Sequence, residues 1–260
     1  MNHLFSTLLA EHASKMETAR GAGKDPRIGC TLNKLDHHAL LGRLGLPHAE
    51  VYRVIKSDDI NADMLKRPCT VKPARGAASV GVMVLDQEGP GWRNARTGRR
   101  VDFAAVKATM ASVQAQYPWW GNDWIIEERL YPADGSPEGL NEYNVFIFGD
   151  AAELIICSRQ NAGKRRVRCW TPAWQEAAIG RLNKYDSPED FKPPIDRSGL
   201  IALAQSVAAG TPFAFVRVDI FETDRGWVVS EVNDWTGNDD YPPYWDRRLG
   251  AAWAAALGQK

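Results

Sequence analysis

The segments FAFVRVDIF (residues 213–221) and GWVVSEVN (226–233) flank the short turn ETDR (222–225) and predict a β-hairpin. This hairpin is the clearest element of the 260-residue chain. Side chains two residues apart on a strand point to the same face, so we expect Arg217 and Asp219 to lie side by side. The hairpin therefore presents at least two charged groups on one face.

The partner strand adds two more polar groups to that face. A short turn places Asp219 roughly opposite Glu231, and Asn233 shares the face of Glu231. Carboxylate and amide oxygens are ligands that Mg²⁺ accepts, and an adjacent Arg217 stabilises charge on a transferred phosphoryl group. We also expect four apolar side chains on the same side, namely Phe215, Phe221, Trp227 and Val229. The alternative interpretation is an exposed hairpin face with salt-bridging charges.

The stretch VKPARGAASVGV (71–82) suggests a phosphate-binding loop. Lys72 ends a strand, and the small residues from Gly76 to Ser79 let backbone N–H groups surround an anion. The lysine precedes the small residues, so this is not a Walker A sequence. An ordinary hairpin loop has a similar composition and remains the alternative.

A third signal combines IIEERL (125–130) with Glu142. An apolar strand that ends in charged residues can offer backbone groups and a carboxylate to adenine, and Glu142 can bind ribose hydroxyls. Glutamates are also common on surface strands, so neither segment is specific alone.

The rest of the chain predicts interleaved hairpins and helices and no run of β-α-β units, which favours an α+β fold. We expect the basic stretch KRRVRCW (164–170) on a mobile segment. The helices are expected within residues 1–30, then at 36–45, 103–117, 198–209 and 245–257; the strands at 50–55, 68–73, 80–85, 124–130 and 142–148 and in the hairpin.

Composition excludes several classes of protein. Equal numbers of basic and acidic residues, 32 each, argue against binding to nucleic acid. There is no apolar window of about 18 residues, so we expect no transmembrane segment. The N-terminus lacks a basic region before its short apolar run, which predicts no signal peptide and a cytoplasmic location. The four scattered cysteines predict reduced thiols and neither a zinc cluster nor a disulfide framework.

Taken in order along the chain, these motifs resemble those of the ATP-grasp superfamily. NKLDHHALLGRLGLPHAEVY (33–52) is similar to the segment that precedes the phosphate loop in that superfamily. The TupA-like branch, associated with polysaccharide biosynthesis, is the most similar, through EYNVFIFGDAAELIICSRQ (142–160), AFVRVDIFETDRGW (214–227) and WDRRLG (245–250). The resemblance covers about residues 33–250.

The resemblance implies two α+β subdomains that grip ATP between antiparallel sheets. It divides the chain into a reduced N-terminal helical segment (1–45), a small subdomain with the phosphate-covering loop (46–130) and a large subdomain with the Mg²⁺-binding hairpin (131–260). A short N-terminal segment leaves an open site, which suits a large acceptor or a partner protein.

The resemblance also implies residue roles, with ATP and Mg²⁺ as cofactors. Arg217 would be catalytic, next to the transferred phosphoryl group, and Mg²⁺ would be held by Asp219, Glu231 and Asn233. ATP would be bound by Lys34, Lys72, Ser79, Glu127, Arg129, Leu130, Glu142 and Lys164, with Arg159 as an alternative to Lys164.

This chain departs from the family pattern at three places. Asn33 replaces an aspartate before Lys34, and Asn144 stands where the branch has a lysine. The hairpin ends in EVNDWTGNDD (231–240), which differs from the branch on the acceptor side.

The reaction that the resemblance implies is ATP- and Mg²⁺-dependent ligation of a carboxylate to an amine. The carboxylate would attack the γ-phosphate to give an acyl phosphate, and the amine would displace phosphate to form an amide. The expected partner is a small-molecule or glycan acceptor, and the basic run suggests an anionic one unless it is a solvated loop. The alternatives are a kinase that phosphorylates a hydroxyl and a non-catalytic nucleotide-binding protein.

Overall fold

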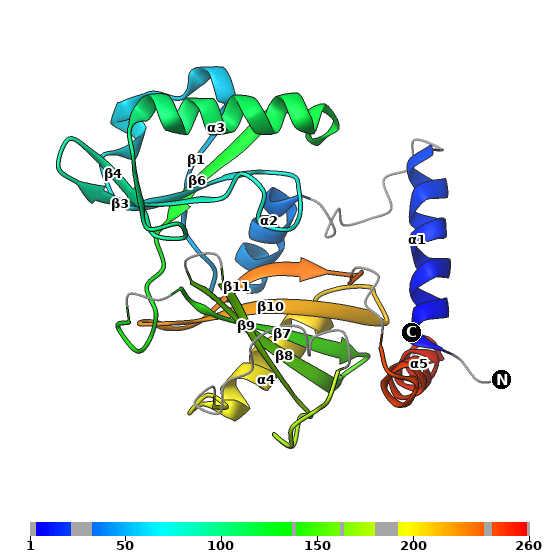
Figure 1. Ribbon diagram of the computed structural model, residues 1–260. Helices are drawn as coiled ribbons and strands as arrows, with labels where there is room; N and C mark the ends of the chain where they lie inside the picture. The colour runs from blue at the N-terminus through cyan, green and yellow to red at the C-terminus, as the bar shows by residue number, and fades with distance from the viewer. Residues whose placement is uncertain are drawn as a thin grey trace.

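The computed structural model describes residues 4–21, 33–136, 139–161, 164–179, 192–236 and 241–258. Two antiparallel sheets form the framework, one above the other, with helices on their outer faces (Figure 1). This confirms the expected α+β architecture. Within the described residues, every helix is too short or too polar to span a bilayer.

The first sheet has six strands in the order β1-β6-β2-β3-β4-β5. Helix α3 (Phe103–Gln116) covers it, because Val106, Met110 and Val113 lie on one helical face and are buried. Asp102 caps this helix by accepting the backbone N–H of Ala105 at 2.8 Å. The strands are β1 (Val51–Lys56), β2 (Cys69–Pro73), β3 (Met83–Glu88), β4 (Gly91–Asn94), β5 (Arg99–Val101) and β6 (Asp123–Glu128).

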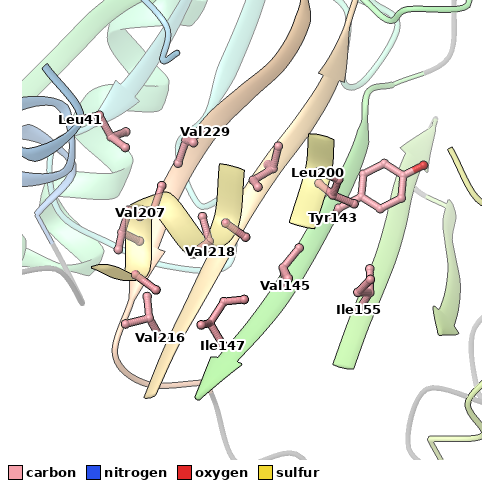
Figure 2. Close-up of a cluster of buried hydrophobic side chains, with 14 of the residues drawn as sticks. Leu41, Tyr143, Val145, Ile147, Ile155, Leu200, Val207, Val216, Val218 and Val229 are labelled. Atoms are coloured by element: carbon pink, nitrogen blue, oxygen red, sulfur yellow. The ribbon is translucent and has the colours of Figure 1, made fainter. Parts of the chain in front are cut away.

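The second sheet has five strands in the order β11-β10-β7-β8-β9. Helix α4 (Arg197–Ala209) packs on one face, where aliphatic side chains form the largest core cluster (Figure 2). Burial of each such side chain contributes about 1.5–3 kcal/mol to the hydrophobic free energy of folding. The strands are β7 (Asn141–Phe148), β8 (Ala151–Asn161), β9 (Lys164–Trp170), β10 (Phe215–Thr223) and β11 (Gly226–Asn233).

The opposite face of the five-stranded sheet is covered at one end only. Helix α1 (Phe5–Gly21) packs there against helix α5 (Pro243–Leu257), and the ring of Phe5 contacts Trp253 at a centroid distance of 5.6 Å. Ser6 donates its backbone N–H to Asp246 on α5 at 2.7 Å. The two helices stand together beside the sheets in Figure 1, and the rest of this face points toward the six-stranded sheet.

Helix α2 (Lys34–Leu44) lies between the two sheets (Figure 1). Asn33 caps its N-terminus by accepting the backbone N–H of Leu35. Gly45 ends it with a left-handed φ of 64°, a conformation that glycine adopts without steric cost. The cap and the terminator therefore fix both ends of a helix that reaches both sheets.

The last hairpin has the expected register at its polar end and a different one beyond it. Asp219 pairs with Glu231, but the next residue of β10, Ile220, pairs with Val229, so Ser230 forms a bulge. The bulge turns Val229 to the α4 face, where it is buried, and Trp227 packs against the same core cluster. The expectation that Trp227 and Val229 share the face of Asp219 was therefore wrong.

The basic stretch is not a mobile segment but strand β9, paired along its length with β8. Strand geometry splits its charges between the two faces of the sheet. Arg168 pairs with Cys157 of β8, which is buried on the α4 side, and Arg166 pairs with Arg159. Arg166 and Arg168 therefore point to the α4 side. Arg165 points to the other face, where its Nη2 lies 3.4 Å from the Oγ of Ser158.

Two further differences concern the first sheet. The strand expected at 80–85 begins only at Met83, because turns with positive φ at Ala78, Ser79 and Gly81 precede it. Strands β4 and β5 were not expected at all. The helix expected within 1–30 ends at Gly21 in the described residues, and residues 22–32 lie outside them.

Candidate functional site

Lys34 connects the two sheets at the centre of the molecule. Its Nζ donates to the carbonyl of Gly76, in the loop of the first sheet, at 2.9 Å. The same Nζ lies 3.4 Å from Oε1 of Glu231, on β11 of the second sheet. Burial lowers the pKa of Lys34, and nearby Lys72 adds to this effect while Glu231 opposes it. A buried ammonium group thus joins the loop of the first sheet to the hairpin of the second.

Lys72 lies close to Lys34 but is held by the first sheet. Its Nζ is 2.6 Å from Oε1 of Glu127, on the neighbouring strand β6. The other oxygen of Glu127 accepts from Nε2 of His38, on α2, at 3.0 Å. Burial alone would raise the pKa of Glu127, but Lys72 and His38 hold it below its ordinary value. Glu127 is thus an ionised carboxylate with both oxygens engaged.

The loop between β2 and β3 contains several residues with positive φ. Gly76 has a φ of 129°, and Ala78 and Ser79 have φ values of 53° and 58°. Backbone turns can direct successive N–H groups toward an anion. A side chain at Gly76 would meet the ring of Trp120 at 2.6 Å, so only glycine fits there. Ser79 is exposed at the end of this loop.

The polar face of the β10–β11 hairpin contains the four residues that the sequence predicted. Arg217 forms a fork with Asp219, Nε to Oδ1 and Nη2 to Oδ2, at 2.7 Å each. Nδ2 of Asn233 donates to Oδ2 of Asp219 at 3.3 Å. Glu231 lies opposite Asp219 in the ladder and reaches Lys34. The structure therefore brings Arg217, Asp219, Glu231 and Asn233 together with Lys34.

Two residues of the neighbouring strand β7 complete this face. Asn144 pairs with Asp219 and hydrogen-bonds its carboxylate. Glu142 pairs with Phe221, one step further along the same face. Burial, together with the negative charges of Asp219 and Glu231, raises the pKa of Glu142 to about 7. Three carboxylates, those of Glu142, Asp219 and Glu231, thus lie close together on this face.

The oxygen donors of this face suit a divalent cation. Asp219, Glu231 and Asn233 offer oxygen donors of the kind that Mg²⁺ prefers. They do not form a complete cage, since no cluster of three or more acidic, histidine or cysteine side chains in the described ranges is arranged to hold a metal alone. Mg²⁺ commonly takes one or two carboxylates and completes its shell with water and phosphate oxygens. The donor set suits an ion bound jointly with a nucleotide.

The predicted adenine-binding residues lie at the end of β6. Arg129 pairs with Asp86 (Nε to Oδ1, 3.1 Å), and its Nη1 donates to the carbonyl of Leu130. Its guanidinium also lies over the ring of Tyr131 at 4.7 Å. Leu130 is buried in a small cluster with Ala49 and Val228. This segment therefore joins the two sheets.

Other predicted residues lie apart from the site or outside the described residues. Lys164 is the first residue of β9, and its side chain is not described. Arg159 donates to Asn141 (2.7 Å) and Asp134 (2.9 Å) on the α4 side of the sheet. On the acceptor side, Asp234 is buried and lies 3.0 Å from Nε2 of His12, whereas Asp239 and Asp240 are outside the described ranges.

Sequence reasoning missed three residues that the structure brings to the site. His38 lies in the segment at 33–52, where the sequence assigned a role to Lys34 alone, and its contact with Glu127 spans 89 residues. Asn144 was regarded only as a departure from the family pattern. Arg165 was not distinguished from the other basic residues of its segment. Had the segment been recognised as a strand, alternation would have placed Arg165 on the face opposite Arg166 and Arg168.

Comparisons with known proteins bear on the family and the fold of the chain. The family model described as TupA-like ATPgrasp matches residues 50–254. No curated protein matches the chain.

Solved structures show the same fold at low identity. D-alanine–D-alanine ligase from Bacillus anthracis superposes with a TM-score of 0.54 and 17% identity, covering 94% of this chain and 72% of that chain. The complex of that ligase with ATP gives a TM-score of 0.51. The corresponding ligase from Helicobacter pylori gives 0.50 with 15% identity, covering 89% of this chain and 60% of that one.

The fold expectation is thus confirmed, and the family match extends over most of the described chain. The chain belongs to the TupA-like ATP-grasp family and has the fold of ATP-dependent ligases.

Proposed function

We propose that this protein is an ATP- and Mg²⁺-dependent carboxylate–amine ligase that forms an amide through an acyl phosphate. The observation that carries the proposal is the position of Lys34, whose Nζ contacts both the Gly76 loop and Glu231. A buried cation between a glycine loop and an acidic hairpin is a suitable place for a polyphosphate. The ATP-grasp membership of the chain supports ATP as that polyphosphate.

The proposed nucleotide site follows from this position. The phosphates would lie between Lys34, Lys72 and the loop that ends at Ser79. The ribose would lie at Glu142, where a carboxyl with a raised pKa can donate as well as accept. Adenine would lie at the end of β6, at Glu127, Arg129 and Leu130, and Lys164 would add a phosphate contact. The proposed subdomains are those at 46–130 and 131–260.

Mg²⁺, held by Asp219, Glu231 and Asn233, would neutralise charge on the phosphate oxygens during transfer. The side chains of the hairpin have separate tasks. Arg217 is fixed by its fork with Asp219, so its remaining N–H groups can meet the transferred phosphoryl group without reorganisation. Asn144 keeps Asp219 in place from the neighbouring strand.

The reaction has two steps. An oxygen of the substrate carboxylate attacks the γ-phosphorus, and the bond from that phosphorus to ADP breaks. The nitrogen of an amine then attacks the acyl carbon, the carbon–oxygen bond to phosphate breaks, and the amine loses a proton to solvent. Positioning of the three reactants between the sheets supplies most of the rate enhancement.

The order of residues along β10 supports a location for the acceptor near the Phe215 end of the strand. From Phe221 the strand passes Asp219 and Arg217 and reaches Phe215, which α1 and α5 cover. The nucleotide occupies the Asp219 end, so the acceptor would lie beyond Arg217. We propose a small-molecule or glycan acceptor from cytoplasmic polysaccharide biosynthesis, and Arg165 is the basic residue of β9 on the site face.

The nucleotide half of the proposal is tested by thermal unfolding of the full chain with a non-hydrolysable ATP analogue. At about 100 times its dissociation constant a ligand adds about 2.7 kcal/mol to the free energy of unfolding. The shift should require Mg²⁺ and should disappear in Glu231→Gln. Glu222→Gln is the matched control, because it makes the same change on the same hairpin but contacts Asn141 and Tyr143.

The chemistry is tested by phosphate release during a screen of uronic acids paired with amino acids. Mass spectrometry of the product separates the candidates: a ligase leaves an amide and free phosphate, whereas a kinase leaves phosphate on the acceptor. An analogue shift that ignores both Mg²⁺ and Glu231→Gln would contradict the proposed site.

A further inference from the structure

The buried carboxylate of Glu127 contacts two side chains, the ammonium of Lys72 and the imidazole of His38. Oε1 is 2.6 Å from Nζ of Lys72, and Oε2 is 3.0 Å from Nε2 of His38. The side chains of Glu127, Lys72 and His38 are 8%, 10% and 12% exposed. Lys72, Glu127 and His38 form what we call the Lys72 relay.

The structure assigns the proton of His38. Nδ1 of His38 is buried and has no hydrogen-bond partner among the described residues. A carboxylate can only accept, so Nε2 must carry the hydrogen that Glu127 receives. The hydrogen of His38 that Glu127 accepts is therefore the one on Nε2.

The ring of His38 is held in this orientation by its surroundings. The ring of His48 lies 5.6 Å away, and Nδ1 of His48 donates to the carbonyl of Leu46 at 2.8 Å. Helix α2 is tied to the first sheet where the backbone N–H of Lys34 donates to Ala74 at 2.8 Å. His38 is thus a rigid donor placed over one oxygen of Glu127.

We propose that His38 is a positioning residue for nucleotide binding: it fixes Glu127, and Glu127 aims the ammonium of Lys72 at the phosphates. This inference rests on the proposed function, because it takes Lys72 as a phosphate ligand. Without His38, Oε2 of Glu127 loses the donor that it has among the described residues, and the carboxylate is free to turn both oxygens toward Lys72. Lys72 would then be drawn back from the phosphate site.

The experiment measures binding of MgADP to the full chain by calorimetry. His38→Ala should weaken MgADP binding about tenfold, the loss expected for one hydrogen bond to a charged group. His38→Gln should restore affinity to within about threefold of the wild type, because its amide N–H can replace Nε2–H. In a Lys72→Met background, His38→Ala should change the affinity less than about twofold, because the residue it positions is gone.

Controls separate this role from a loss of folding. Each variant's melting temperature is measured without ligand, and His12→Gln changes another histidine–carboxylate pair that does not touch the Lys72 relay. ¹⁵N spectra of the imidazoles report the tautomer of His38 directly. Wild-type protein that does not bind MgADP would refute the proposed function.

Other outcomes would overturn only the inference. These are normal MgADP binding in folded His38→Ala, an equal loss in the Lys72→Met background, failure of rescue in folded His38→Gln, or an Nε2 of His38 that carries no hydrogen. The proposed nucleotide site would then remain, without a role for His38.

Discussion

The fork between Arg217 and Asp219 should stabilise the ligand-free protein as well as the site. Both hydrogen bonds are 2.7 Å long, and the side chains are only 21% and 4% exposed. Asp219→Asn keeps the shape of the side chain but removes its charge. The guanidinium of Arg217 then stays largely buried with no counter-charge in the fork, which is the costly way to break a buried ion pair.

We expect Asp219→Asn to lower the free energy of unfolding by about 3 kcal/mol, because a hydrogen bond to a charged group is worth about 1.5–3 kcal/mol and one of the two keeps a neutral acceptor. For a chain of this length, that corresponds to a fall of about 6 °C in melting temperature. The double variant Arg217→Met/Asp219→Asn should recover about 2 kcal/mol of the loss, since neither residue of the fork is then charged.

Urea unfolding without nucleotide and without Mg²⁺, followed by tryptophan fluorescence and by circular dichroism, measures these differences if the two transitions coincide. Asp123→Asn is the control, because its pair with Lys56 is about half exposed and should be worth less than about 1 kcal/mol. A single variant as stable as the wild type, or a double variant less stable than the single one, would refute the argument. The result also decides how activity losses in Asp219 variants are interpreted.

Three further predictions concern other parts of the molecule. Lys34→Met should weaken MgADP binding about tenfold or more, whereas Lys56→Met, at an exposed pair, should leave it unchanged; calorimetry measures both. Val218→Ala, at a fully buried position, should cost about 2 kcal/mol in urea unfolding, and Val54→Ala, at 48% exposure, less than about 0.5 kcal/mol. Burial raises the pKa of Cys69 to about 11 and that of Cys169 to about 12, so few thiolates form at pH 8. A disulfide reagent should therefore modify the three buried thiols, Cys69, Cys157 and Cys169, only after unfolding; rapid modification in the native state would contradict this.

The sequence was most informative where a local rule applies to neighbouring residues. Alternation along a strand is sufficient to pair Arg217 with Asp219 and Glu231 with Asn233, and the turn length set the two strands in register. The bulge at Ser230 could not be predicted in this way. It depends on how β11 packs on α4 and on its neighbours, and serine carries no signal for it.

Contacts between distant segments account for the other differences. Glu127 meets Lys72 through strand pairing and His38 through a helix that lies 89 residues earlier in the chain, and no local pattern encodes that meeting. The stretch at 164–170 was misjudged for a related reason. Its charge suggested a solvated loop, whereas its pairing with β8 makes it a strand with charges on both faces.

The packing of α1 against α5 has a consequence for how the chain folds during synthesis. Ser6 and Asp246, which join the two helices, are 240 residues apart. At about 5–20 residues per second, α1 waits about 10–50 s on the ribosome before its partner is made. Through that time Phe5 and Leu9, both buried in the finished protein, have no α5 to pack against. The packing of α1 against α5 must therefore be a late event, and a nascent chain that stalls before residue 245 leaves Phe5 and Leu9 without this partner, so that chaperones can bind them.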